Sequence, residues 1–244
     1  MSFVGAAAFA IFNLLVSARL VLLARRTRGR PELFLGTGFF FSGFFGLVFF
    51  QVAGSIEVLD PRVRAASLAA GLLALYIGVA ASALFVREAY ARAKPVASAV
   101  YATIAALAVL VGAVEVGLGV HNDYDALVMP TPRLMFGLCF RTLCAVIVAE
   151  RNWAAYRAFR RQIVFGLTTK EVLNRVLLYS VATTGAVVIH LLSIYTRFSM
   201  GMGLRGDGDV MTVASWVGVV SGVCLWLAFS PPRWFVRRFG GVGG

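Results

Sequence analysis

Charged residues are scarce in this chain of 244 residues, because Asp, Glu, Lys and Arg make up 14% of it while hydrophobic residues make up 60%. Soluble globular domains average roughly 25% charged and 45–50% apolar residues. The apolar excess is too large for an ordinary soluble core. We therefore expect much of this chain to face lipid.

Residues that carry chemistry are also few. Lys94 and Lys170 are the only lysines, and both lie in connections between apolar runs, so the seventh apolar run has no lysine for a retinal Schiff base. The three cysteines lie within apolar runs, which excludes a disulfide framework. His121 and His190 are the only histidines, too few and too far apart for a bis-histidine haem or a clustered zinc site. Catalytic motifs and phosphate-binding glycine loops are absent as well, so we predict no enzyme activity, no metal and no cofactor.

Long hydrophobic runs dominate what remains. A bilayer core about 30 Å thick requires ~20 mostly apolar residues per helix, and such runs are too long for barrel strands. The fifth run is the weakest because Arg141 lies near its middle. We predict an all-α, polytopic bundle of seven transmembrane helices over residues 1–230, followed by a short basic interfacial tail at 231–244. The predicted spans are residues 3–24, 33–53, 65–86, 96–120, 131–149, 173–196 and 210–229.

The basic residues predict the orientation of this bundle. Of 23 Lys and Arg residues, sixteen fall in the connections after spans one, three and five and in the tail, and five fall on the opposite side. Cytoplasmic loops carry the excess of Lys and Arg, so the N-terminus is predicted outside and the C-terminus in the cytoplasm. The expected location is the plasma (inner) membrane of a bacterium. Because this topology accounts for the net charge of +12, we expect no nucleic-acid partner.

The longest connection, residues 150–172, lies on the basic side and interleaves Trp153, Tyr156 and Phe159 with arginines. It predicts that the fifth helix continues beyond the membrane or lies on the anionic inner leaflet. Two interpretations follow. The basic and aromatic residues anchor the helix end to lipid, or they form a docking surface for a cytoplasmic signalling partner.

Small residues spaced four apart occur in the second and seventh spans. This spacing lets helix backbones approach closely, either inside the core or along the seam of a homodimer. Core packing is the first interpretation and the homodimer the second. The residues are Gly38, Ser42 and Gly46, and Ala214, Gly218 and Gly222.

The most informative residues are ionisable ones inside the apolar runs: Glu115, Arg141 and His190. At ~1.5 Å rise per residue, all three lie in the outer half of the bilayer, and Gln51 and His121 lie near the same external rim. Charged side chains at this depth are costly unless they find a partner. We predict a Glu115–Arg141 ion pair with His190 close enough to join it. The pair either fixes helix register or belongs to a ligand or proton-linked site open to the outside.

Two boundary segments carry a resemblance. The segment RTRGRPEL at 26–33 joins the first two spans, and WLAFSPPRW at 226–234 ends the seventh. Together they resemble uncharacterised bacterial seven-helix integral membrane proteins, similar to the membrane input modules of signalling proteins. The resemblance implies a role in signalling and no particular site residue. Because the chain ends at Gly244 without an output domain, a separate partner is expected to receive any signal.

The sequence supports two functions. The first is a receptor-like or signalling-associated protein with a ligand pocket in the outer half and a basic cytoplasmic face for a partner. The second is a small transporter or channel that uses the same intramembrane polar residues. Polar residues are sparse in the inner halves of the spans, where Asn174, Ser180 and Tyr101 stand nearly alone, and this favours a pocket over a pore. A structural subunit without a ligand is the third alternative.

Overall fold

The computed structural model describes residues 2–55, 60–118, 132–200, 208–232 and 235. Almost all of these residues are helical, and no strand occurs in the described ranges, which confirms the all-α class. The helices are α1 (Ser2–Thr27), α2 (Arg30–Gly38), α3 (Gly46–Ser55), α4 (Pro61–Val86), α5 (Pro95–Gly117), α7 (Pro132–Val164), α8 (Lys170–Met200) and α9 (Gly208–Phe229). Two π-helical segments join them, η1 (Phe39–Phe45) between α2 and α3, and η2 (Arg87–Ala91) after α4.

The helix boundaries follow local chemistry. Proline occupies the first turn of α2, α4 and α5, where its missing N–H costs no helical hydrogen bond. Asp60 caps α4 by accepting a 2.8 Å hydrogen bond from the backbone N–H of Arg62. The turn between α7 and α8 contains Gly166 at φ +68°, a backbone conformation that suits glycine.

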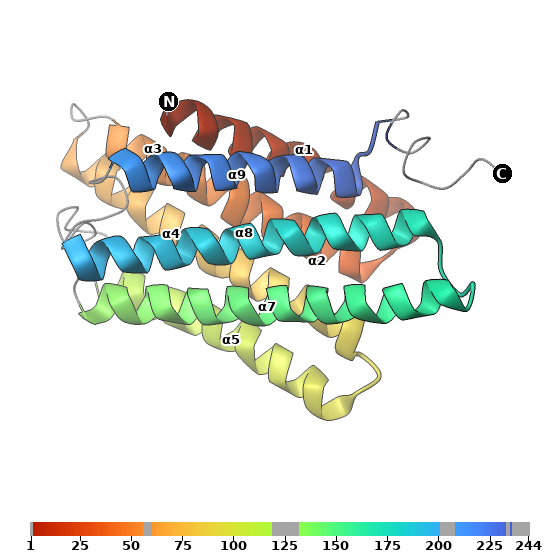
Figure 1. The fold of residues 1–244 in the computed structure, drawn as a ribbon. Helices are drawn as coiled ribbons and strands as arrows, with labels where there is room; N and C mark the ends of the chain where they lie inside the picture. The colour runs from red at the N-terminus through yellow and green to blue at the C-terminus, as the bar shows by residue number, and fades with distance from the viewer. Residues whose placement is uncertain (1, 56–59, 119–131, 201–207, 233–234, 236–244) are drawn as a thin grey trace.

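The bundle is organised around α4. This helix packs against the continuous α2–η1–α3 helix, α5 and α7, while α1, α9, α8 and α7 pack in sequence around it. In the most apolar stretch of α4, 56% of the residues are buried, against 22–33% in the other five apolar helices. Figure 1 shows α7 and α8 side by side along the bundle, joined at one end, which we call the turn end.

Six helical segments are long and apolar enough to cross a membrane, so the chain is a multi-pass membrane protein. They are Ala7–Thr27, Arg30–Ala53, Arg62–Ala91, Pro95–Gly117, Lys170–Ser199 and Gly208–Phe229. The fifth predicted span corresponds to α7, which is not one of these six segments. Helix α7 extends to Val164, which confirms that it continues past residue 149. The predicted limits at 120 and 131 lie outside the described residues.

The small residues in the second and seventh spans serve packing within the chain. A Cβ on Gly38 would meet the Ser82 hydroxyl at 3.2 Å, and one on Gly222 would meet the Phe12 ring at 2.9 Å. The first contact joins α2 to α4 and the second joins α9 to α1. Core packing is therefore the interpretation that the structure supports for these glycines.

Candidate functional site

Glu115 on α5 and Arg141 on α7 form the ion pair predicted from the sequence. Arg141 Nη1 lies 3.7 Å from Glu115 Oε2, and each side chain is only 6% exposed. Glu115 lies in the last turn of α5, two residues before Gly117, and Arg141 lies on the third turn of α7. The pair therefore ties α5 to α7 at the end of the bundle opposite the turn end.

Tyr76 on α4 completes this cluster. Its side chain is buried, with 1% of the residue exposed, and the Arg141 guanidinium carbon lies 4.9 Å from the centre of its ring. A cation over an aromatic face is stabilised by the ring quadrupole. Three helices thus meet through one carboxylate, one guanidinium and one phenol, which we call the Tyr76–Glu115–Arg141 cluster.

Two glycines make room for the cluster. A Cβ on Gly112 would approach the Tyr76 ring to 2.8 Å, and a Cβ on Gly137 would overlap both the Glu115 carboxylate and the Tyr76 hydroxyl. Gly112 precedes Glu115 by three residues and Gly137 precedes Arg141 by four, spacings that place residues on one helix face. The sequence analysis did not predict Tyr76 or the two glycines. The sequence does contain a signal for the glycines, because each lies three or four residues before a charged residue on its own helix.

The ion pair leaves hydrogen-bonding capacity unused. A separation of 3.7 Å exceeds the roughly 2.7–2.9 Å of a charge-assisted hydrogen bond. Both Glu115 oxygens, Arg141 Nη1 and the Tyr76 hydroxyl oxygen are buried without a hydrogen-bond partner in the structure. Such groups cost about 1–3 kcal/mol each. The attraction within the cluster is therefore mainly Coulombic, and a donor of Arg141 is left without an acceptor.

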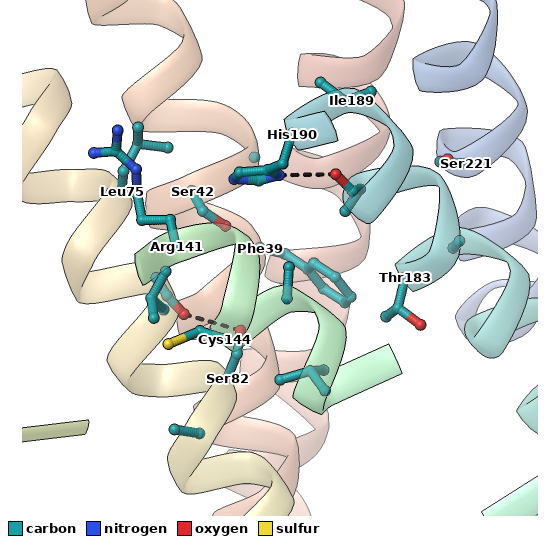
Figure 2. Close-up of a pocket in the computed structure, with 18 of the residues that line it drawn as sticks. Phe39, Ser42, Leu75, Ser82, Arg141, Cys144, Thr183, Ile189, His190 and Ser221 are labelled. Atoms are coloured by element: carbon teal, nitrogen blue, oxygen red, sulfur yellow. Dashed lines mark hydrogen bonds between the residues drawn. The ribbon is translucent and has the colours of Figure 1, made fainter. Parts of the chain in front are cut away.

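A cavity of about 290 Å³ lies beside the cluster, inside the bundle. Its walls come from α1, η1, α4, α5, α7, α8 and α9, and most of its lining is apolar (Figure 2). Ligand pockets typically measure about 300–1,000 Å³, so this cavity suits one small molecule. Arg141 lines the cavity, whereas Glu115 is not among its lining residues.

Most polar side chains in the cavity wall are already satisfied by their own helices. Each donates a hydrogen bond of 2.7–2.9 Å to a backbone carbonyl four residues earlier. They therefore present little unmet polarity to a ligand. These residues are Asn13, Ser42, Ser82 and Ser221.

His190 lines the same cavity from α8. Its Nδ1 lies 2.8 Å from the carbonyl oxygen of Ala186, and in Figure 2 the ring extends from α8 toward the side on which Arg141 rises from α7. Because a carbonyl only accepts, Nδ1 carries a proton, and in the neutral form of the ring Nε2 is then an acceptor. His190 thus joins Arg141 at the cavity wall, without a direct bond to the ion pair in the described structure.

The other two predicted site residues do not join this group. Gln51 is half-buried on α3 and is not among the residues that line the cavity. His121 lies outside the described residues. The structure therefore brings Glu115, Arg141 and His190 to one region of the bundle and leaves Gln51 outside the cavity wall, to which no described residue of α3 contributes.

A second polar cluster lies nearer the turn end. Asn152 on α7 is fully buried, accepts a 3.2 Å hydrogen bond from the Tyr90 hydroxyl and donates one of 3.4 Å to Thr183. Next to it, Trp153 donates a 2.9 Å hydrogen bond to Thr184 on α8. Asn152 is a buried polar group that the sequence analysis did not single out. The reason is that α7 continues through the stretch assigned to a connection and turns Asn152 toward α8.

No group of three His, Cys, Asp or Glu side chains within the described part of the chain is placed to hold a metal ion. No protein-family model, curated protein or solved structure matches this sequence. The resemblance to bacterial seven-helix modules stays a prediction.

Proposed function

We propose that this chain is a receptor-like membrane protein that binds a small, largely apolar molecule in its central cavity and acts through its basic end. The observation that carries the proposal is the cavity itself. Seven segments of the chain line it, and Arg141 and His190 bring a guanidinium and an imidazole to its mostly apolar wall. A buried apolar cavity with a few convergent polar groups is the usual form of a small-molecule site.

The proposal includes seven membrane crossings with the turn end in the cytoplasm of a bacterial cell. Helix α7 packs against α8, which is long and apolar enough to span, so the two helices cross together. The exposed arginines 157, 160 and 161 lie near the turn end. The excess of basic residues on that side supports its cytoplasmic placement in the inner membrane.

Helix α7 offers a direct mechanical route between the cavity and the basic end. Its 33 residues span about 50 Å, well beyond the ~30 Å bilayer core. Arg141 lies at the cavity, and the hydrogen bonds of Asn152 and Trp153 fix the register of α7 against α8 further along. A ligand that favours one position of α7 over another would shift the exposed end accordingly.

The exposed end of this hairpin is suited to a partner. Val164, Phe165 and Leu167 are 78%, 76% and 74% exposed, next to exposed arginines. In the proposed receptor, this surface contacts a cytoplasmic signalling protein. Contact with the anionic inner leaflet is the alternative role for the same residues.

The alternative function is a small transporter or channel. An aromatic cluster argues against an open path toward the turn end, since Tyr179 packs edge-to-face on Phe39, Phe85 and Phe229 with ring centres 5.6–6.2 Å apart. Tyr179 is 5% exposed and lines the cavity. A path through this point needs the aromatic cluster to separate, whereas a receptor pocket does not.

A cavity-filling substitution tests the proposal. Ala186 lines the cavity, so Ala186→Phe is expected to lower binding of a mixture of decanoate, decanol and decyltrimethylammonium at least tenfold, measured as one-to-one adducts by native mass spectrometry. Ala106→Phe is the matched control because Ala106 is exposed on the surface of α5, and it should bind like the unmodified protein. Equal adduct formation by both variants would rule out the cavity as the binding site.

A further inference from the structure

We infer that the central cavity selects an amphiphilic anion, with its anionic group at Arg141 and an unbranched or aromatic apolar body in the remainder of the cavity. This inference rests on the proposed function, because it names the ligand class of the same site. It depends on three properties of the cavity wall: its positive charge, the hydrogen-bond donor that Arg141 leaves unused, and the mainly apolar character of the remaining lining.

The sign of the charge favours an anion. Arg141 is the one charged side chain among the described residues that line the cavity, and no lining residue is acidic. Glu115, the counter-ion of Arg141, is not among the lining residues, and its Oε2 lies 3.7 Å from Arg141 Nη1. An ammonium group in the cavity would face a guanidinium at close range, with the balancing carboxylate further away.

The unused donor favours an anion with oxygen acceptors. A guanidinium carries five N–H donors in a planar fork that matches carboxylate and phosphate oxygens. In the structure Arg141 Nη1 has no hydrogen-bond partner, and the Glu115 oxygens stand too far away to accept a short bond. Nη1 itself is buried, so a ligand carboxylate or phosphate reaches it after a small shift of the guanidinium toward the cavity that Arg141 lines. His190 adds no positive charge while its ring is neutral, so the preference for anions depends on Arg141.

The rest of the cavity favours an apolar body. Asn13, Ser42, Ser82 and Ser221 in its wall donate to backbone carbonyls of their own helices. Tyr101, Tyr179 and Thr183 also line the cavity, but most of the wall is apolar and includes Leu75, Val79, Ile147, Val148 and Leu225. A chain with further hydrogen-bonding groups would find few partners there. The same chemistry is available from a free fatty acid and from an anionic phospholipid of the bilayer.

The test compares three probes with the same ten-carbon chain: decanoate, decanol and decyltrimethylammonium. Native mass spectrometry of protein in uncharged detergent should show decanoate bound about tenfold or more tightly than the other two, the ratio expected for a charge-assisted hydrogen bond. Glu115→Gln keeps Arg141 and removes its counter-ion, so it should increase the preference for decanoate. The neutral double variant Glu115→Gln/Arg141→Gln should lose the preference, and His190→Phe should keep it.

Nanodiscs distinguish the two sources of the anion. Decanoate binding is measured in nanodiscs of phosphatidylcholine and in nanodiscs of phosphatidylglycerol. Equal binding in both identifies a free amphiphile as the ligand, whereas weaker binding in phosphatidylglycerol identifies a bilayer lipid that competes for the site. Either result supports an anionic ligand. Decanol binding as tightly as decanoate, with Ala186→Phe blocking both, would overturn the anion inference and leave the cavity as a ligand site. Unchanged probe binding in Ala186→Phe would overturn the proposed function as well.

Discussion

The substitution Glu115→Gln is expected to lower the free energy of unfolding by about 3–5 kcal/mol, because it leaves the Arg141 cation buried without its counter-ion. The double variant Glu115→Gln/Arg141→Met should recover most of this loss. Replacing both members of a buried pair removes the desolvation penalty together with the attraction, and the net effect is often neutral. Unfolding titrations in mixed micelles, combined as a double-mutant cycle, measure the coupling between the two residues.

A surface pair provides the control for this cycle. Glu171 and Arg175 form an ion pair one turn apart on α8, and their side chains are 34% and 45% exposed. Glu171→Gln should change the free energy of unfolding by about 0.5 kcal/mol or less. If Glu115→Gln lowers the free energy of unfolding no more than Glu171→Gln does, the buried pair does not hold α5 to α7.

Gly137→Ala is the second substitution with a large expected effect. The added Cβ would overlap the Glu115 carboxylate and the Tyr76 hydroxyl, so α7 must move away from α4 and α5 or the pair must separate. We expect a loss of about 3 kcal/mol in the free energy of unfolding, as in overpacked cores. Binding of decanoate should weaken as well, because Arg141 moves with α7.

Gly117→Ala is the matched control for Gly137→Ala. A Cβ on Gly117 meets nothing within 4 Å, and this glycine belongs to the last turn of α5. Alanine at a helical position without steric conflict is expected to be neutral or to stabilise by up to about 1 kcal/mol. A Gly137→Ala protein as stable as Gly117→Ala would contradict the close packing of the three helices in the cluster.

The Glu115–Arg141 pair could be predicted because the rise of a helix is uniform. Counting residues from the predicted span ends placed both charges at compatible depths, and two opposite charges in an apolar bundle have strong reason to meet. Tyr76 could not be found in this way. A tyrosine within an apolar run has no distinguishing pattern, and its role depends on which face α4 turns toward α7.

Asn152 and the cavity show where prediction from the sequence fails. Asn152 follows the predicted end of a span at residue 149, and the continuation of the helix to Val164 does not by itself show which of its residues turn toward α8. The cavity is the space that seven segments leave unfilled, so it depends on the packing of all of them at once. Periodicity and composition of single segments contain no such information.

Alkylation of Cys144 tests the central claim, that an amphiphilic anion occupies the cavity beside Arg141. Cys144 is buried and lines the cavity on α7, one turn from Arg141, whereas Cys139 is exposed on the surface of the same helix and serves as the internal reference. The rate at each cysteine is measured by peptide mass spectrometry with a small uncharged maleimide, with and without saturating decanoate. The account predicts that decanoate slows Cys144 at least tenfold and leaves Cys139 unchanged. An unchanged rate at Cys144, or equal slowing at both cysteines, would contradict it.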